Sequence, residues 1–136
     1  MNPQYVTHVS CACYKCTADL ASRDTLEAAM RKALAGTGAK VLGAACQSYA
    51  PCGLTCVLFL AESHLAVTTW PEFSLAIVDV QLCNDRMDPV PVVTRLAELL
   101  GSTSRTVNRF AHRIAQDADE PADACGGATP KEQGTR

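Results

Sequence analysis

The sequence lacks a strong excess of either charge and has no apolar segment long enough to cross a bilayer. Its 12 Lys and Arg residues and 14 Asp and Glu residues leave a net charge of −2, so no overall basic field attracts nucleic acid. A membrane-spanning helix needs about 20 consecutive apolar residues, and the N-terminal residues show no secretory signal pattern. We therefore expect a cytoplasmic protein with no nucleic-acid partner and no membrane association.

Cysteine, in contrast, is abundant, with eight residues in the chain. An even number suits a disulfide framework, but that interpretation requires a secretory context. We therefore expect reduced thiols, several of them filling the core as small apolar side chains. The spacings Cys13–Cys16 and Cys52–Cys56 are compatible with zinc ligands, although the apolar flanks of Cys56 favour a core position. A structural metal site remains the alternative, and we expect no metal.

Hydrophobic periodicity predicts two helices in this 136-residue chain, a length that fits one domain. In the first helix, Asp24 and Glu27 have the spacing of a capping box, and the segment "GTG" at 36–38 ends the apolar repeat. The second helix is expected over 92–101, closed by Gly101, after a proline-containing loop.

Strand-like patterns account for most of the remaining chain up to residue 115. We predict strands at 5–14, 39–47, 54–60, 65–70, 74–82 and 103–114, where the last segment also allows a helix. The expected fold class is α+β: a two-layer sandwich in which two helices cover one face of a mostly antiparallel sheet. We place the domain at 1–115 and expect the polar, aperiodic segment 116–136 to be a disordered tail.

Three reactive side chains, Glu62, Ser63 and His64, stand between the apolar runs "LTCVLFL" and "SLAIVDVQL". A hydrolytic Ser-His pair is disfavoured, because neighbours in a strand point to opposite faces. The serine also lacks the Gly-x-Ser-x-Gly elbow of hydrolases. Another chemistry has to explain these residues.

The segment "FLAESHLAVTTWPEFSLAIVDVQLC" closely resembles the central segment of the prokaryotic S-adenosylmethionine decarboxylase proenzymes. In that family the segment reads approximately A-E-S-H-x-x-x-H-T-W-P-E, followed by an aromatic residue, an apolar strand with Asp, and Cys. Upstream, "QSYAPCGLT" also resembles the family pattern, and the order of elements agrees over about residues 5–114. The matching residues are Glu62, Ser63, His64, Thr69, Trp70, Pro71, Glu72, Phe73, Asp79 and Cys83.

This resemblance implies that the chain makes its own cofactor. The hydroxyl of Ser63 attacks the carbonyl of Glu62, and the resulting ester undergoes β-elimination and hydrolysis, which leaves a pyruvoyl group at Ser63. The pyruvoyl carbonyl then forms a Schiff base with the substrate amine and withdraws electrons from the breaking bond. Cys83 matches the family's proton donor. The implied function is decarboxylation of S-adenosylmethionine, which supplies the aminopropyl donor for spermidine synthesis.

Other positions carry implied roles in processing, substrate binding and assembly. Thr55 stands where the family has a processing serine. Tyr49 matches an aromatic residue that stacks on adenine, and Glu72 matches an acid that binds the ribose hydroxyls. Leu65 and Trp70 are candidates for the pocket wall. The family is built on homodimers, whose sites include residues from both protomers.

Thr68 is the main departure from the family pattern. The family has a histidine there, which is expected to remove the Cα proton during β-elimination, and threonine cannot act as that base near neutral pH. Three interpretations stay open. The chain is an S-adenosylmethionine decarboxylase that processes slowly or with another base, a pyruvoyl decarboxylase of another amino acid such as arginine or ornithine, or an unprocessed paralogue without catalysis.

Overall fold

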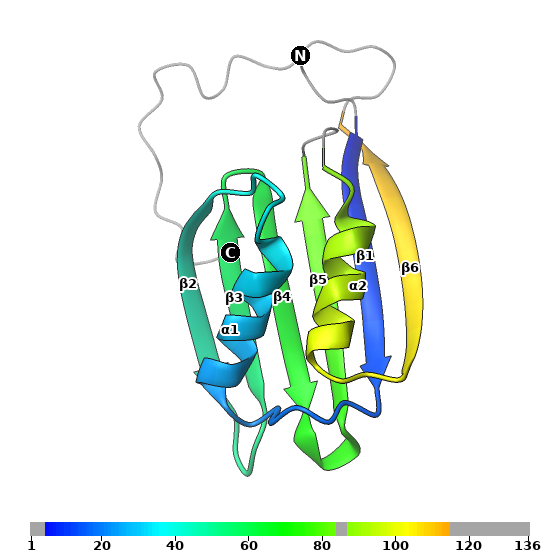
Figure 1. Ribbon diagram of the computed structural model, residues 1–136. Helices are drawn as coiled ribbons and strands as arrows, with labels where there is room; N and C mark the ends of the chain where they lie inside the picture. The colour runs from blue at the N-terminus through cyan, green and yellow to red at the C-terminus, as the bar shows by residue number, and fades with distance from the viewer. Residues whose placement is uncertain (1–4, 84–86, 115–136) are drawn as a thin grey trace.

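The computed structural model describes residues 5–83 and 87–114. A six-stranded antiparallel sheet has the strand order β2-β3-β4-β5-β1-β6, and both helices lie on the same face of it (Figure 1). This arrangement confirms the predicted two-layer α+β fold, and the last segment is a strand rather than a helix. The elements are β1 (Tyr5–Tyr14), α1 (Arg23–Leu34), β2 (Val41–Ser48), β3 (Leu54–Leu60), β4 (Ser63–Trp70), η1 (Pro71–Phe73), β5 (Leu75–Leu82), α2 (Pro89–Leu99) and β6 (Ser104–Arg113).

The core lies between the helices and the sheet. In β4, Leu65, Val67 and Thr69 are buried beneath the helices, as strand alternation requires. The other face carries no helix among the described residues, and we call it the open face. It includes His8, Phe59, His64, Thr68, Trp70, Asp79, Gln81, Phe110 and His112.

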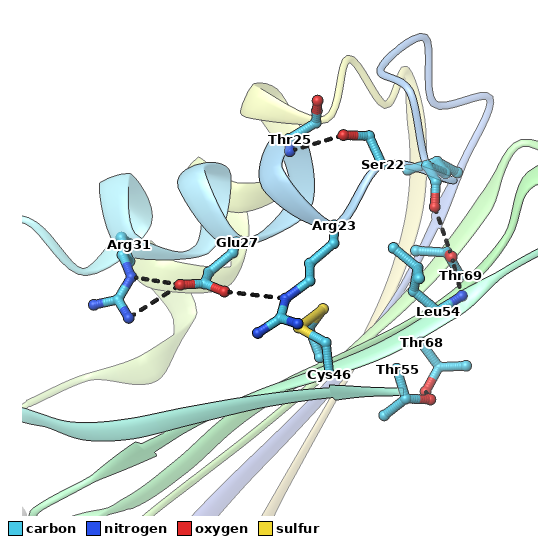
Figure 2. Close-up of a disulfide and its surroundings, with 12 residues drawn as sticks. Ser22, Arg23, Thr25, Glu27, Arg31, Cys46, Leu54, Thr55, Thr68 and Thr69 are labelled. Carbon is cyan, nitrogen blue, oxygen red and sulfur yellow. Dashed lines mark hydrogen bonds and ion pairs between the residues drawn. A yellow bond between two sulfur atoms is a disulfide. The ribbon is translucent and has the colours of Figure 1, made fainter. Parts of the chain in front are cut away.

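The helix starts differ from those predicted. Ser22, and not Asp24, is the N-cap of α1, because its Oγ accepts a hydrogen bond from the Thr25 N–H at 3.2 Å (Figure 2). The second helix begins at Pro89 rather than at residue 92, since Asp88 caps it and proline suits the first helical turn. Gly101, with φ +73°, follows the C-cap of α2. No helix in the described ranges is long and apolar enough to span a membrane.

The expectation that all cysteines are reduced is wrong for one pair. Cys46 and Cys56 form a disulfide (Figure 2). They are direct partners in the β2–β3 ladder, with Cα atoms 4.1 Å apart, so the hairpin register brings the two sulfur atoms together. The predicted tail at 116–136 lies outside the described residues.

Thr69 is a buried polar residue that ties β4 to two other segments. Its hydroxyl donates to the Leu20 carbonyl at 2.9 Å and accepts from the Leu54 N–H at 3.0 Å. Only 3% of the residue is exposed, so water cannot easily replace either bond.

Replacing Thr69 by valine should therefore lower the free energy of unfolding by about 2 kcal/mol, because an unpaired buried polar group costs about 1–3 kcal/mol. Urea denaturation measures the change. Thr106→Val, on the exposed strand β6, is the control and should change stability by less than about 0.5 kcal/mol. Equal stability of the two variants would contradict a role for the Thr69 hydroxyl.

Candidate active site

The peptide bond between Glu62 and Ser63 lies where β4 begins, beside the end of β5. Ser63 pairs with Leu82, so the next residue, Cys83, is placed next to the Glu62 carbonyl. The Cys83 backbone N–H donates to that oxygen at 3.0 Å, and the Cys83 thiol donates to it at 3.1 Å. Of the sequence-predicted residues, Cys83 thus contacts Glu62 directly, at the peptide bond that joins Glu62 to Ser63.

Two donors on one carbonyl oxygen form an arrangement that stabilises negative charge. Donors at about 2.7–3.1 Å from a developing oxyanion are the geometric mark of an oxyanion hole. Here the thiol and the backbone amide come from the same residue, Cys83, whose side chain is exposed. Attack on the Glu62 carbonyl carbon would place negative charge on the oxygen that these groups contact.

Ser63 has a backbone conformation that few residues other than glycine adopt, with φ +151°. Such positions cost about 1–3 kcal/mol and persist where the surrounding structure enforces them. Ser63 is held from both sides, by Leu60 in β3 and Leu82 in β5. The conformational strain therefore lies next to the Glu62–Ser63 peptide bond.

The same conformation corrects the expectation that Ser63 and His64 cannot interact. Ser63 Oγ lies 3.2 Å from His64 Nδ1, because the unusual φ angle removes Ser63 from regular strand alternation. His64 Nε2 in turn lies 3.2 Å from Asp79 Oδ2. The other oxygen of Asp79 contacts His8 Nε2, and His8 Nδ1 lies 3.4 Å from His112 Nε2.

A second group of predicted residues surrounds a cavity of about 430 Å³ near the other end of β4. The Tyr49 hydroxyl donates to Thr55 Oγ1 at 2.9 Å. Thr55 and Thr68 are ladder partners, and their hydroxyl oxygens are also 2.9 Å apart (Figure 2). The lining residues are Tyr49, Ala50, Pro51, Cys52, Thr55, Thr68, Thr69, Trp70 and Glu72.

The chain does not bring these two groups together. Thr68 is five residues from Ser63 along β4, a separation of about 16 Å at the usual rise of a strand. Leu65 belongs to neither group, because it is fully buried in the core beneath the helices. The predicted site residues therefore form a junction at one end of the sheet and a cavity at the other.

Three further cysteines, Cys11, Cys13 and Cys16, are buried in the core. The hydrogen bond to the Cys11 thiol, together with burial, raises the pKa of Cys13, and burial raises the pKa of Cys16. Raised pKa values disfavour the metal-binding thiolate at Cys13 and Cys16, whereas the hydrogen bond with Cys13 lowers the pKa of Cys11. Cys56 is engaged in the disulfide, and the described residues contain no cluster of three or more His, Cys, Asp or Glu arranged to hold a metal ion.

Fold and junction together define a two-layer α+β protein with a polarised Glu–Ser peptide bond at the start of a central strand. A family profile described as S-adenosylmethionine decarboxylase matches residues 7–113. The chain belongs to the S-adenosylmethionine decarboxylase family, a family of carboxy-lyases.

Several relatives carry the name S-adenosylmethionine decarboxylase proenzyme. The relative from Thermosipho africanus is 33% identical over 96 residues, which are 70% of this chain and 74% of that protein. The relative from Clostridium kluyveri is 30% identical over 114 residues, 83% of this chain and 90% of that protein. The relative from Pseudomonas paraeruginosa is 37% identical over 83 residues, 61% of this chain and 52% of that protein.

A solved structure shares the fold. The crystal structure of the adenosylmethionine decarboxylase from Aquifex aeolicus superimposes with a TM-score of 0.74 at 22% sequence identity. The match covers 88% of this chain and 99% of that one.

Proposed function

We propose that this chain cleaves itself between Glu62 and Ser63 and then decarboxylates S-adenosylmethionine, supplying the aminopropyl donor for spermidine synthesis. The observation that carries this proposal is the junction itself. The Glu62 carbonyl oxygen accepts both the amide and the thiol of Cys83, and the adjacent Ser63 has a strained backbone. Its hydroxyl is the nucleophile nearest in the chain to that carbonyl.

The residues at the junction suit an N-to-O acyl shift. Attack by Ser63 Oγ on the Glu62 carbonyl carbon moves charge onto the oxygen that Cys83 contacts, so both donors stabilise the tetrahedral intermediate. Opening this intermediate gives an ester between Glu62 and the Ser63 side chain. Because the shift replaces the peptide bond at Ser63, it also offers a way to release the backbone strain there.

Completion of processing would leave a pyruvoyl group at position 63, and this group supplies the electron sink for loss of the carboxylate. The junction fits such a group, because both β3 and β5 hold the start of β4 in place. Cys83 would then act as the proton donor to the product carbon. Its thiol is exposed and already directed at the junction, 3.1 Å from the Glu62 carbonyl oxygen.

The cavity at the other end of β4 is the candidate binding site for S-adenosylmethionine. Its volume of about 430 Å³ falls within the usual range of small-molecule pockets, roughly 300–1,000 Å³. Tyr49 and Trp70 offer aromatic surfaces for adenine and the sulfonium. Glu72 offers a carboxylate for the ribose hydroxyls.

A second copy of the chain would complete the site. The junction and the cavity lie at opposite ends of β4, so two sheets stacked through their open faces about a two-fold axis would bring one copy's junction near the other's cavity. Phe59 and Phe110 on the open face are 48% and 49% exposed, which suits burial against a partner. We therefore propose a homodimer.

The unprocessed paralogue is the second candidate, and Thr68 favours it. The Thr68 hydroxyl contacts Thr55 at 2.9 Å, and position 68 offers no imidazole for β-elimination. Such a chain would keep the cavity and bind a ligand without making the pyruvoyl group.

Intact-mass measurement of the purified protein tests self-cleavage directly. We expect fragments of 62 and 74 residues, the larger with a blocked N-terminus, together with release of CO₂ from carboxyl-labelled S-adenosylmethionine. Ser63→Ala should abolish cleavage, because no nucleophile remains. A Ser63→Ala chain cut at the same bond would implicate a contaminating protease. An intact parent chain without ester or activity would support the paralogue.

Changing Cys83 should separate processing from turnover. Cys83→Ala keeps the backbone N–H donor, so cleavage should slow by no more than about 10-fold, the loss of roughly one modest hydrogen bond. Turnover should fall by about 100-fold or more, the usual scale of general acid catalysis. Cleavage by gel and CO₂ release by radiometry measure the two effects. Unchanged turnover in the variant would reduce Cys83 to a role in processing.

Thr68→His should accelerate the elimination step. In the unmodified chain we expect the ester to accumulate with unchanged mass, detectable because hydroxylamine cleaves esters much faster than amides. The imidazole introduced by Thr68→His titrates near pH 6.5 and should convert the ester to fragments within the time course. Rapid, complete processing of the unmodified chain, with no gain in the variant, would show that another group removes the Cα proton.

A further inference from the structure

We propose that His64 is the proton carrier of the acyl shift at Ser63 and that Asp79 is its positioning residue. This inference rests on the proposed self-cleavage and assigns one step of it. The motif contains a histidine at position 64, but neither its spacing nor strand alternation suggests contact with the serine hydroxyl. The structure shows that contact, at 3.2 Å between Ser63 Oγ and His64 Nδ1.

The hydrogen bonds around His64 select the tautomer that the reaction needs. A carboxylate can only accept hydrogen bonds, so His64 Nε2, 3.2 Å from Asp79 Oδ2, carries the proton and donates it. In the neutral ring, Nδ1 is then the unprotonated nitrogen and accepts the Ser63 hydroxyl proton. The order serine, imidazole and carboxylate has the roles of a hydrolase triad, with the two ring nitrogens exchanged.

Asp79 is itself fixed in place. Its other carboxylate oxygen contacts His8 Nε2, so the carboxylate is bound on both sides by imidazoles from β1 and β4. Asp79 and His64 have side-chain exposures of 38% and 29%, which leaves the pair partly shielded from solvent. A carboxylate held in this way can stabilise the imidazolium that forms when His64 takes a proton.

The proton and the electrons balance within the two residues and the scissile bond. As Ser63 Oγ bonds to the Glu62 carbonyl carbon, its proton moves to His64 Nδ1, and the carbonyl π electrons move to the oxygen. When the tetrahedral intermediate opens, the carbon–nitrogen bond breaks, and the nitrogen takes the proton back from His64. The products are the ester and a free amine, and no outside reactant is consumed.

This assignment gives the acyl shift and the β-elimination to different residues. Thr68 is about 16 Å from Ser63 along β4, and its hydroxyl contacts Thr55, so it takes no part in the acyl shift within one chain. His64 is in contact with the nucleophile. The departure at position 68 therefore affects elimination, and the acyl shift retains its own base.

The test measures ester formation, the step in question. The full-length protein is refolded, and mass spectrometry follows two fractions over time. One is the fraction already cleaved, and the other is the fraction that hydroxylamine splits at Glu62–Ser63. Their sum measures ester formation. His64→Gln should slow ester formation by about 100-fold, the lower scale of general base catalysis. Asp79→Asn should slow it less, because the imidazole remains. Lys32→Gln, an exposed substitution on α1 at the opposite face of the sheet, is the control.

The pH profile and chemical rescue distinguish proton transfer from a structural role. Groups that face His64 are Asp79, with His8 and His112 beyond it, while its ladder neighbours Phe59 and Gln81 are uncharged. Ester formation by the parent should rise with pH, because only a neutral imidazole can accept the Ser63 proton, and His64→Gln should lose this dependence. Free imidazole should restore ester formation in His64→Ala, even if that variant is less stable.

The outcomes separate this inference from the proposed function. Parent-like ester formation in His64→Gln, or the absence of imidazole rescue in His64→Ala, would overturn the role of His64 while cleavage and decarboxylation by the parent stand. A parent that forms neither ester nor fragments would overturn both. Loss in His64→Gln, with rescue in His64→Ala and a parent-like Lys32→Gln, would support the assignment.

Discussion

The antiparallel register between β4 and β5 is the constraint on which the junction depends. Pairing of Ser63 with Leu82 sets Cys83 beside the Glu62 carbonyl, and pairing of Ala66 with Asp79 puts that carboxylate diagonally across from His64. A slip of one residue would reverse the faces of every side chain in the strand. The register is enforced by burial, because Leu65 and Val67 in β4 and Val78 and Val80 in β5 are all 0–1% exposed. The core beneath the helices thus fixes contacts that lie on the opposite face.

The strained serine illustrates how a sheet can hold an unfavourable backbone conformation beside the proposed cleavage site. Ser63 is the first residue of a central strand, paired on both sides, so relaxation of its φ angle would disturb two ladders. Local preference and global fold disagree at this residue, and such disagreements are expected at functional positions. A more exposed loop would leave the serine free to adopt an ordinary conformation, and the strain beside the Glu62–Ser63 peptide bond would be lost.

Much of the fold was predictable because its signals are local. Alternating apolar residues identified the strands, and the apolar repeat that ends at Gly101 identified α2. The helix begins before that repeat, because Asp88 caps it and Pro89 is its first residue. The family resemblance singled out Glu62, Ser63 and Cys83, and the structure places Cys83 in contact with Glu62. The links from Asp79 to His64 and His8 did not follow from the sequence. The His8 link joins β1 to β5 across 71 residues of sequence, and the His64 link depends on the exact register of the β4–β5 pair. The Ser63 φ angle and the Cys46–Cys56 disulfide likewise depend on strand pairing that no sequence pattern prescribes.

The strand order has a consequence for the timing of the cut. Chain 1–62 contributes β1, β2 and β3, and the remainder contributes β4, β5 and β6, but in the sheet the two sets interleave as β2-β3, β4-β5, β1 and β6 (Figure 1). Three of the five strand interfaces would therefore join different polypeptides after cleavage. Folding before the cut is a unimolecular process, whereas refolding afterwards requires two fragments to find each other and depends on their concentration. Self-cleavage would thus make unfolding effectively irreversible, and the cleaved native state would persist because its unfolding is slow.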